Sequence, residues 1–312
     1  KHIKRYYIEQ SSNFISWGEW LAEPREWRFF EGERVYSRKI VGKTLYSAYI
    51  DTEIVADQSV YIAKKKENNN YNFKYVIGIL NTKLLAWYFR HKHNEFDDLF
   101  PQIKISQFKD LPILISSYKN QKPLIQKANK IIDFYHQYNL NRKTSFYELN
   151  KKYCGNDGPT LSSITTQSQF FNQIYTGRAR KVRPLTVNIN DNILTVYAEK
   201  SSSGQYELFK FQVDDDYQRR YIQLYLENLT EEKLEEVNNY SGNLPEKVLK
   251  IEIPDYNKSN VVQKVVDEWQ SLQDEIESLE SKIEQTDREI DEMVYELYGL
   301  TDEEIEIVEG SV

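Results

Sequence analysis

Hydrophobic residues recur with a helical period over the last part of the chain. From Val262 to Leu297 they alternate in steps of three and four residues, a seam of about five heptads in which Thr286 is the only polar member. Such a seam is typical of a coiled coil or of a long helix packed on another helix, and Gly299 is expected to end it. A second helix is predicted over residues 123–138. We expect the two helices to pack antiparallel within the chain.

The stretch 71–115 combines a helical pattern with a basic end. Apolar residues within 76–89 follow the spacing of one buried helix face, and the polar residues 81–83 are expected on the opposite side. The helix ends in a basic, aromatic run. Pro101 and Pro112 then favour extended backbone. The stretch therefore predicts a helix that carries a basic edge beside two proline-bounded strands.

Alternating patterns predict short strands before this helix. Residues 34–40 alternate, Gly42–Lys43 suits a hairpin turn, and 44–49 returns as a second strand. Further short strands are predicted at 54–56 and 58–63. This first part of the chain therefore contains a small sheet.

The second half of the chain predicts an antiparallel meander. Residues 141–180 are less regular, and two polar helices follow the meander, at 217–229 and at 231–240 with Thr230 as N-cap. A further strand is expected at 248–253. The three strands of the meander are 184–189, 193–199 and 205–213.

Together these elements predict an α/β (α+β) fold with a mixed β-sheet, a β-meander insertion and a long C-terminal coiled-coil-like helix. We expect four parts along the chain. They are a first subdomain at 1–120, a connecting helix at 121–140, an insertion or second subdomain at 141–258, and the long helix with an acidic tail at 259–312.

The charge is distributed unevenly. The net charge of −7 by itself argues against a nucleic-acid partner. Residues 1–200, however, hold 31 Lys and Arg against 19 Asp and Glu, a balance of +12, whereas residues 201–312 hold 10 against 29, a balance of −19. This asymmetry predicts a part that faces a polyanion and an acidic remainder, although two ordinary solvated surfaces would give the same counts.

The single cysteine, Cys154, excludes an internal disulfide and a cysteine-based zinc site and fits a reducing cytoplasm. No apolar run is long enough to span a bilayer and no signal peptide is recognisable, so we expect a cytoplasmic protein without a membrane partner. The chain starts at a lysine, which indicates a piece of something longer.

The basic residues of the first half are the best candidates for a functional surface. Lysine and arginine neutralise phosphates and so position a duplex, while a few Arg, Lys, Asn or Gln side chains read base edges. Residues 68–70 (three asparagines), Gln102 and Gln107 are suited to adenine. The predicted DNA-binding residues are Arg34, Arg38, Lys39, Lys43, Lys64, Lys65, Lys66, Arg90, Lys92, Lys104 and Lys109.

Metal sites are the weaker hypothesis. His91 and His93, with two aspartates at 97–98, could form one, but a solvated basic helix end explains them better because no cysteine or third histidine is near. A magnesium nuclease centre needs clustered carboxylates with a lysine. The residues of that chemistry, at loose spacing, are Asp191, Glu207 and Lys210. We therefore predict no metal site and no catalytic residue in this chain.

Five phrases of the sequence, taken together, resemble the TaqI-like C-terminal specificity domain over residues 14–140 and 265–309. That domain is the target-recognition part of adenine-specific DNA methyltransferases and of fused type II restriction–modification enzymes. The phrases are WLAEPREWRFFEGERVYSRKI at 20–40, ADQSVYI at 56–62, GILNTKL at 78–84, FPQIKISQFKDLPI at 100–113 and IDEMVYELYGLTDEEIEIVE at 290–309.

The resemblance implies sequence-specific recognition of double-stranded DNA by a target-recognition subdomain at 1–120. An upstream methyltransferase domain, outside this chain, would flip out the adenine and methylate its N6. S-adenosylmethionine, and magnesium if the parent enzyme also cuts DNA, would be cofactors of that parent. No cofactor is expected for this chain, because it has neither adjacent prolines for a [DN]-P-P-[YF] loop nor a glycine-rich methyl-donor loop.

Two other functions remain open from the sequence. The heptad seam would also suit a coiled-coil interaction or scaffold module that dimerises between chains, and a concentration-dependent mass would distinguish it. A nuclease that acts alone would require magnesium-dependent cleavage by this chain, which we do not expect.

Overall fold

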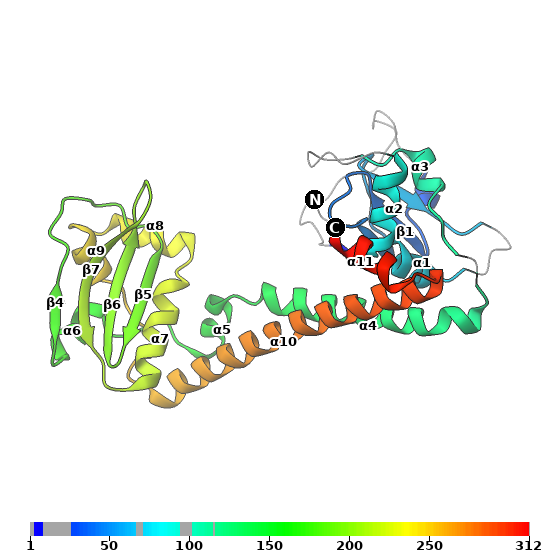
Figure 1. Ribbon diagram of the computed structural model, residues 1–312. Coiled ribbons are helices and arrows are strands. Elements are labelled where there is room, and N and C mark those ends of the chain that lie inside the picture. The colour runs from blue at the N-terminus through cyan, green and yellow to red at the C-terminus, as the bar shows by residue number, and fades with distance from the viewer. Residues whose placement is uncertain (1–2, 9–25, 67–70, 94–101, 115, 312) are drawn as a thin grey trace. The chain divides into compact units, whose positions relative to one another are not determined.

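The computed structural model describes residues 3–8, 26–66, 71–93, 102–114 and 116–311 (Figure 1). It divides into two compact units, each with its own antiparallel sheet. Unit 1 comprises Lys1–Asn139 and Ser278–Val312, and unit 2 comprises Leu140–Glu277. Helices and strands mixed in this way, with a long C-terminal helix, confirm the predicted α/β class. Predictions for residues 68–70 and 97–98 lie outside the described part.

The sheet of unit 1 has the order β2-β1-β3. Strand β1 (Arg34–Arg38) pairs antiparallel with β2 (Ser47–Ile50) and with β3 (Val60–Ala63). A single 3-10 turn, η1 (Trp27–Phe29), precedes it. The strand predicted at 54–56 is wrong. The Ile54 carbonyl accepts hydrogen bonds from the side chains of two residues of β1, in place of a backbone N–H of a neighbouring strand.

The single helix predicted from the pattern of 76–89 is in fact two helices, α1 (Phe73–Leu80) and α2 (Lys83–His93). Asn81 and Thr82 lie at the break and are fully buried, not on a polar face as the pattern predicted. The Asn81 side chain accepts from the Ser47 N–H (2.8 Å) and donates to the Ser47 carbonyl (2.9 Å). The polar residue is therefore buried because it completes the end of strand β2.

The two proline-bounded strands predicted after α2 are also wrong. Gln102 forms only an isolated bridge with Ile40, and a short helix, α3 (Ile105–Lys109), follows at once. The Gln107 side chain explains this start, since its carbonyl oxygen accepts from the Lys104 N–H at 2.6 Å. Residues 111–113 form a tight turn instead of a strand, since the Ile113 N–H donates to the Leu111 carbonyl at 3.0 Å.

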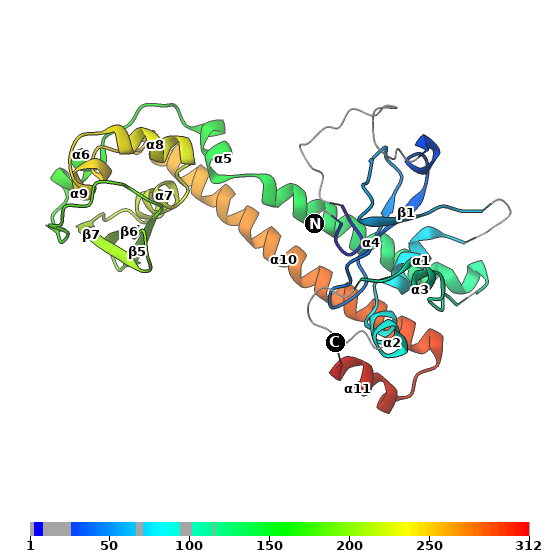
Figure 2. The ribbon, with the colours of Figure 1, turned by 90° about the horizontal axis from the view of Figure 1, so that it is seen from above.

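Two long helices pair antiparallel within unit 1, as predicted. Helix α4 (Tyr118–Lys143) and helix α10 (Ser259–Tyr298) run side by side in both views (Figures 1 and 2). Lys127 pairs with Glu289, and the Tyr138 hydroxyl donates to Glu280 at 2.6 Å. Residue numbers therefore increase along α4 in the direction in which they decrease along α10. Gly299, at φ +69°, ends α10, and α11 (Asp302–Gly310) follows and contacts α2.

A buried ion cluster ties the N-terminal segment to α10. The Arg5 guanidinium forms an ion pair with Asp287 and donates to the Asn81 carbonyl at 2.7 Å. Asp291, one turn further along, accepts from the Lys83 N–H at 3.1 Å, while its second carboxylate oxygen is buried without a hydrogen bond. Burial and the neighbouring Asp287 raise the pKa of Asp291 to about 7, against the opposing charge of Arg5.

Stability should therefore fall as pH rises through the range of this carboxyl. Burial disfavours the ionised form of Asp291 in the folded chain. The free energy of unfolding is therefore highest below the ordinary pKa of aspartate. It decreases as pH rises from there to about 7, by up to about 4 kcal/mol. Asp291→Asn should flatten this decrease. Chemical denaturation from pH 5 to 8 measures it, with the exposed Glu284→Gln as control; a slope unchanged in the Asn variant would contradict the assignment.

Unit 2 holds a four-stranded antiparallel sheet of order β4-β7-β6-β5. Three strands match the predicted meander: β5 (Leu185–Asn190), β6 (Ile193–Glu199) and β7 (Gln205–Gln212). Figure 2 shows the helices of this unit gathered on one side of the sheet. The remaining elements are α5 (Phe146–Tyr153), α6 (Leu161–Gln167), β4 (Phe171–Gln173), α7 (Asp216–Glu227), α8 (Glu231–Asn239) and α9 (Leu244–Val248).

One element of unit 2 was predicted wrongly. The expected strand at 248–253 is replaced by the end of α9 and an irregular segment, in which Glu252 forms an isolated bridge with Thr160. Asn243 caps α9 through a reciprocal bond with Glu246, and this local capping favours the helix over a strand. The predicted N-cap of α8, Thr230, is confirmed, since its hydroxyl accepts from the Lys233 N–H.

Candidate nucleic-acid interface

Arg34, the first predicted DNA contact, points into the protein. Its side chain is 0% exposed and donates to the carbonyls of Gly32 (2.7 Å) and Thr52 (2.5 Å) and to the Tyr36 hydroxyl (3.1 Å). A side chain with its donors occupied and no contact with solvent cannot reach a phosphate. The prediction for Arg34 is therefore corrected: the arginine stabilises the turn regions around β1.

Seven other predicted residues lie on segments that the structure brings together. The Ile103 N–H donates to the Lys39 carbonyl at 2.9 Å, and Arg90 donates to the Gly42 carbonyl at 2.7 Å. The loop after β1, the end of α2 and the start of α3 therefore meet. We call this set the basic edge; its members are Arg38, Lys39, Lys43, Arg90, Lys92, Lys104 and Lys109.

Aromatic rings support two cations of the basic edge. The Arg38 guanidinium lies 4.7 Å from the centre of the Tyr46 ring, and the Lys39 ammonium lies 5.3 Å from that of Tyr61. Tyr61 is itself fixed, because its hydroxyl donates to the Ile103 carbonyl at 3.0 Å. Such stacking orders long side chains without neutralising their charge. The sequence analysis missed both tyrosines, although each faces a cation on a neighbouring strand or loop.

The exposed cations of the basic edge keep their charge available. Lys43, Lys104 and Lys109 are exposed and form no ion pair with any residue that the structure describes. Lys92 donates to the Tyr88 hydroxyl at 2.7 Å, and this bond, followed by the charge of Asp110 at the end of α3, raises the pKa of Lys92. The edge therefore presents exposed positive charge to the solvent.

Lys64, Lys65 and Lys66 lie at the other end of the sheet. Because β1 and β3 are antiparallel, with Val35 opposite Ala63, this loop borders the start of β1 and not its end. Lys64 donates to the Glu31 carbonyl at 2.9 Å, and Lys65 pairs with Glu33 at 3.0 Å. Two of the three lysines are therefore engaged, and only Lys66 is exposed without such a contact among the described residues.

The residues considered for metal binding have ordinary contacts. The His91 ring nitrogen lies 2.9 Å from the Trp87 carbonyl, one helical turn earlier. Lys210 pairs with Glu207 at 2.8 Å on strand β7. Within the described ranges, no group of three or more His, Cys, Asp or Glu is placed to hold a metal ion.

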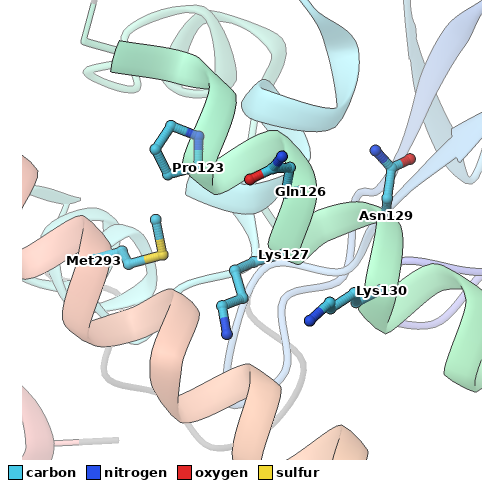
Figure 3. A pocket seen from close by; sticks show the side chains of 6 residues that line it. All are labelled: Pro123, Gln126, Lys127, Asn129, Lys130 and Met293. Carbon is cyan, nitrogen blue, oxygen red and sulfur yellow. The ribbon is translucent and has the colours of Figure 1, made fainter. Parts of the chain in front are cut away.

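A hollow of about 620 Å³ lies between α4 and α10 in unit 1 (Figure 3). Its lining holds neither a carboxylate nor a histidine, and Lys127 leaves it to pair with Glu289 on α10. The hollow is therefore a feature of the contact between the two helices. The residues that line it are Pro123, Gln126, Lys127, Asn129, Lys130 and Met293.

The part of the chain that carries the basic edge is similar to a known family. Residues 1–113 match the family model of the TaqI-like C-terminal specificity domain, which confirms the resemblance over that part of the chain. The match contains the sheet of unit 1, helices α1 to α3 and all the residues of the basic edge.

The name of one curated relative combines a restriction enzyme with a methyltransferase. The chain is 28% identical over 139 residues to "Putative type II restriction enzyme and methyltransferase RM.MjaORFECS2P" of Methanocaldococcus jannaschii. The alignment covers 44% of this chain and only 11% of that protein's length. Among the described residues, none of the helices combines the length and apolar character needed to cross a membrane.

Proposed function

We propose that this chain recognises double-stranded DNA as the specificity domain of an adenine-N6 DNA methyltransferase or of a fused restriction–modification enzyme. The observation that carries the proposal is the basic edge, where three segments of the matched family region meet and present exposed, unpaired lysines. Cations of this kind set the position of a duplex through its phosphates. The half-buried Gln107 is occupied as a cap, so the exposed Gln102 is the better candidate to read a base.

The chemistry of the parent enzyme is part of the same proposal. An upstream methyltransferase domain would supply S-adenosylmethionine and the flipped-adenine pocket, and magnesium would serve only a cleaving partner. This chain would grip the duplex and choose its sequence. Binding of the chain to pooled random duplexes over a salt series tests this role: enrichment of one motif, with affinity that falls steeply with salt, is expected, and no binding at low salt would overturn the proposal.

Neutralising the basic edge should weaken DNA binding and its salt dependence together. In Lys43→Gln/Lys104→Gln/Lys109→Gln we expect affinity for any duplex to fall roughly tenfold to a hundredfold. The slope of log affinity against log salt should fall by up to about three, since each phosphate contact contributes about 0.9. Fluorescence anisotropy at several salt concentrations measures both quantities.

The matched control removes three exposed lysines of the same unit from the α4–α10 pair, in Lys119→Gln/Lys122→Gln/Lys282→Gln. It should retain the affinity and the slope of the unchanged chain. If the control and the basic-edge variant lose the same affinity, net charge alone governs binding and the basic edge has no special role.

The scaffold alternative gains less support from the contacts. In unit 1 the apolar seam of α10 packs on α4 and on helices α1 and α2 of the same chain. Ile283 and Ile290 of the seam are buried there. A dimer through this seam would first have to separate the helix pair. Sedimentation over a wide concentration range should therefore give the mass of one chain.

A further inference from the structure

Unit 2 carries a second cationic surface that lies outside the matched family region. Residues 177–184 form an irregular segment between β4 and β5, and we call them the arginine arm. Arg178, Arg180 and Lys181 are exposed and Arg183 is half-exposed. No carboxylate occurs anywhere from residue 158 to residue 190, although unit 2 as a whole has more acidic than basic residues, 21 against 17.

The backbone of the arm is held in place. The Val182 N–H donates to the Asn238 side chain at 2.7 Å, and the Asn238 amide donates back to the Val182 carbonyl at 2.8 Å. Val182 is buried in the core of the unit, and the Ala179 carbonyl accepts from the Leu244 N–H at 3.2 Å. Ala179 and Val182 therefore anchor the arm to α8 and α9, while Arg178, Arg180 and Lys181 are exposed.

An aromatic contact fixes the start of the arm. The Tyr175 hydroxyl accepts from the Ala179 N–H at 3.1 Å, and the Tyr175 ring folds back over Gly177. A Cβ atom at residue 177 would lie 2.4 Å from the hydroxyl oxygen of Tyr175, so glycine is required for this close approach. Tyr206 packs edge-on against Tyr175, with ring centres 4.9 Å apart. The cations therefore extend from an ordered base.

None of the four cations has an acidic partner in the part of the chain that the structure describes. The backbone of Glu199 is hydrogen-bonded to the arm, since its N–H donates to the Pro184 carbonyl, yet among the described residues no ion pair joins its carboxylate to the arm. Four lysines elsewhere in unit 2 are paired: Lys152 with Glu268, Lys210 with Glu207, Lys233 with Glu236 and Lys258 with Asp255. The arm thus gathers four cations without an acidic partner into the six residues 178–183.

We infer that the arginine arm is a second phosphate-binding surface, which contacts the sugar–phosphate backbone of duplex DNA. Three of its four cations are arginines, whose planar donor groups match phosphate oxygens in pairs. The arm has few groups that accept hydrogen bonds from bases, so it adds affinity and not sequence choice. The inference rests on the proposed function, because it assumes that the ligand of the chain is duplex DNA.

The test neutralises the arm in the full chain, as Arg178→Gln/Arg180→Gln/Lys181→Gln/Arg183→Gln. We expect affinity for duplex DNA to fall roughly tenfold or more and the salt slope to fall by up to about four. The motif enriched from random duplexes should stay the same, because the arm reads no bases. The matched control, Lys152→Gln/Lys210→Gln/Lys233→Gln/Lys258→Gln, makes the same change of charge on the same unit at paired lysines and should bind as the unchanged chain does.

The outcomes separate the two proposals. If the unchanged chain binds duplex DNA and the arm variant binds equally well, the arm inference is overturned while the proposed function stands. If the unchanged chain does not bind duplex DNA at all, the proposed function fails first. An arm variant that loses affinity for an RNA hairpin or an acidic peptide, but not for duplex DNA, would also overturn the inference. A circular-dichroism melt checks that each variant folds.

Discussion

Asn81→Ala should destabilise unit 1 by about 2–4 kcal/mol, a large share of the stability of a typical domain. The side chain is fully buried and forms two hydrogen bonds with the backbone of Ser47, 34 residues earlier. The Ser47 carbonyl would keep its bond from the Tyr6 N–H, but the Ser47 N–H would be buried without a partner. The loss of that bond and the cost of the unpaired donor together give the expected size.

Asn81→Asp distinguishes this role from simple packing. The carboxylate would still accept from the Ser47 N–H but would face the Ser47 carbonyl, so ionisation would be disfavoured in the folded chain. Its pKa would be raised, and the stability of this variant should increase as pH falls. Denaturant unfolding at pH 5 and pH 8 measures the effect. Asn120→Ala, at an exposed position of α4, is the control; equal stability of the Asn81 and Asn120 variants would refute the role.

The sequence predicted elements whose periodicity is local. The seam of α10 and the strands of the meander were found because each pattern is repeated within one segment, and the α4–α10 pairing followed from two apolar stripes that need a cover. Even the end of α10 was readable, since Gly299 can adopt positive φ without strain.

The sequence could not predict features that depend on distant partners. The polar residues 81–83 looked like a solvent-facing interruption, and only the position of Ser47 in space shows that Asn81 belongs inside. The extended backbone expected after Pro101 gave way to a helix start at Ile105, because the Gln107 side chain caps it. Periodicity specifies which face of an element is apolar, but it does not specify which backbone groups a distant segment leaves unpaired.

The candidate interface was predicted as one set of basic residues. The structure separates this set into the basic edge, the lysines at the other end of the sheet and the buried Arg34. The basic edge assembles because Arg90 and Ile103 bond to the loop after β1, contacts that no spacing in the sequence announces. The arginine arm was overlooked because its region was irregular, although the alternation of cations with Ala179 and Val182 was visible. Absence of carboxylates over a long stretch was the signal that could have found it.

Arg34→Ala should unfold unit 1 more readily, by about 3–5 kcal/mol, without a specific effect on DNA binding by the folded chain. Removal of the guanidinium leaves the carbonyls of Gly32 and Thr52 without their donor and opens a cavity beside Tyr36. The Ile54 carbonyl would be spared, because the Tyr36 hydroxyl also donates to it at 2.5 Å. Thermal and denaturant unfolding of the chain measure the loss.

Arg34→Lys makes the argument sharper, because it keeps the charge but not the forked donors. A single ammonium cannot bond both the Gly32 and the Thr52 carbonyl in the geometry of the guanidinium, so most of the destabilisation should remain. A DNA-contacting arginine would behave in the opposite way: lysine would largely preserve binding, and alanine would weaken binding while the melting temperature stayed constant. The exposed Lys66→Ala provides the reference for a basic residue without structural contacts, with little expected change in stability. If Arg34→Ala melted like Lys66→Ala and bound duplex DNA less tightly, Arg34 would return to the interface and the buried geometry around β1 would be wrong.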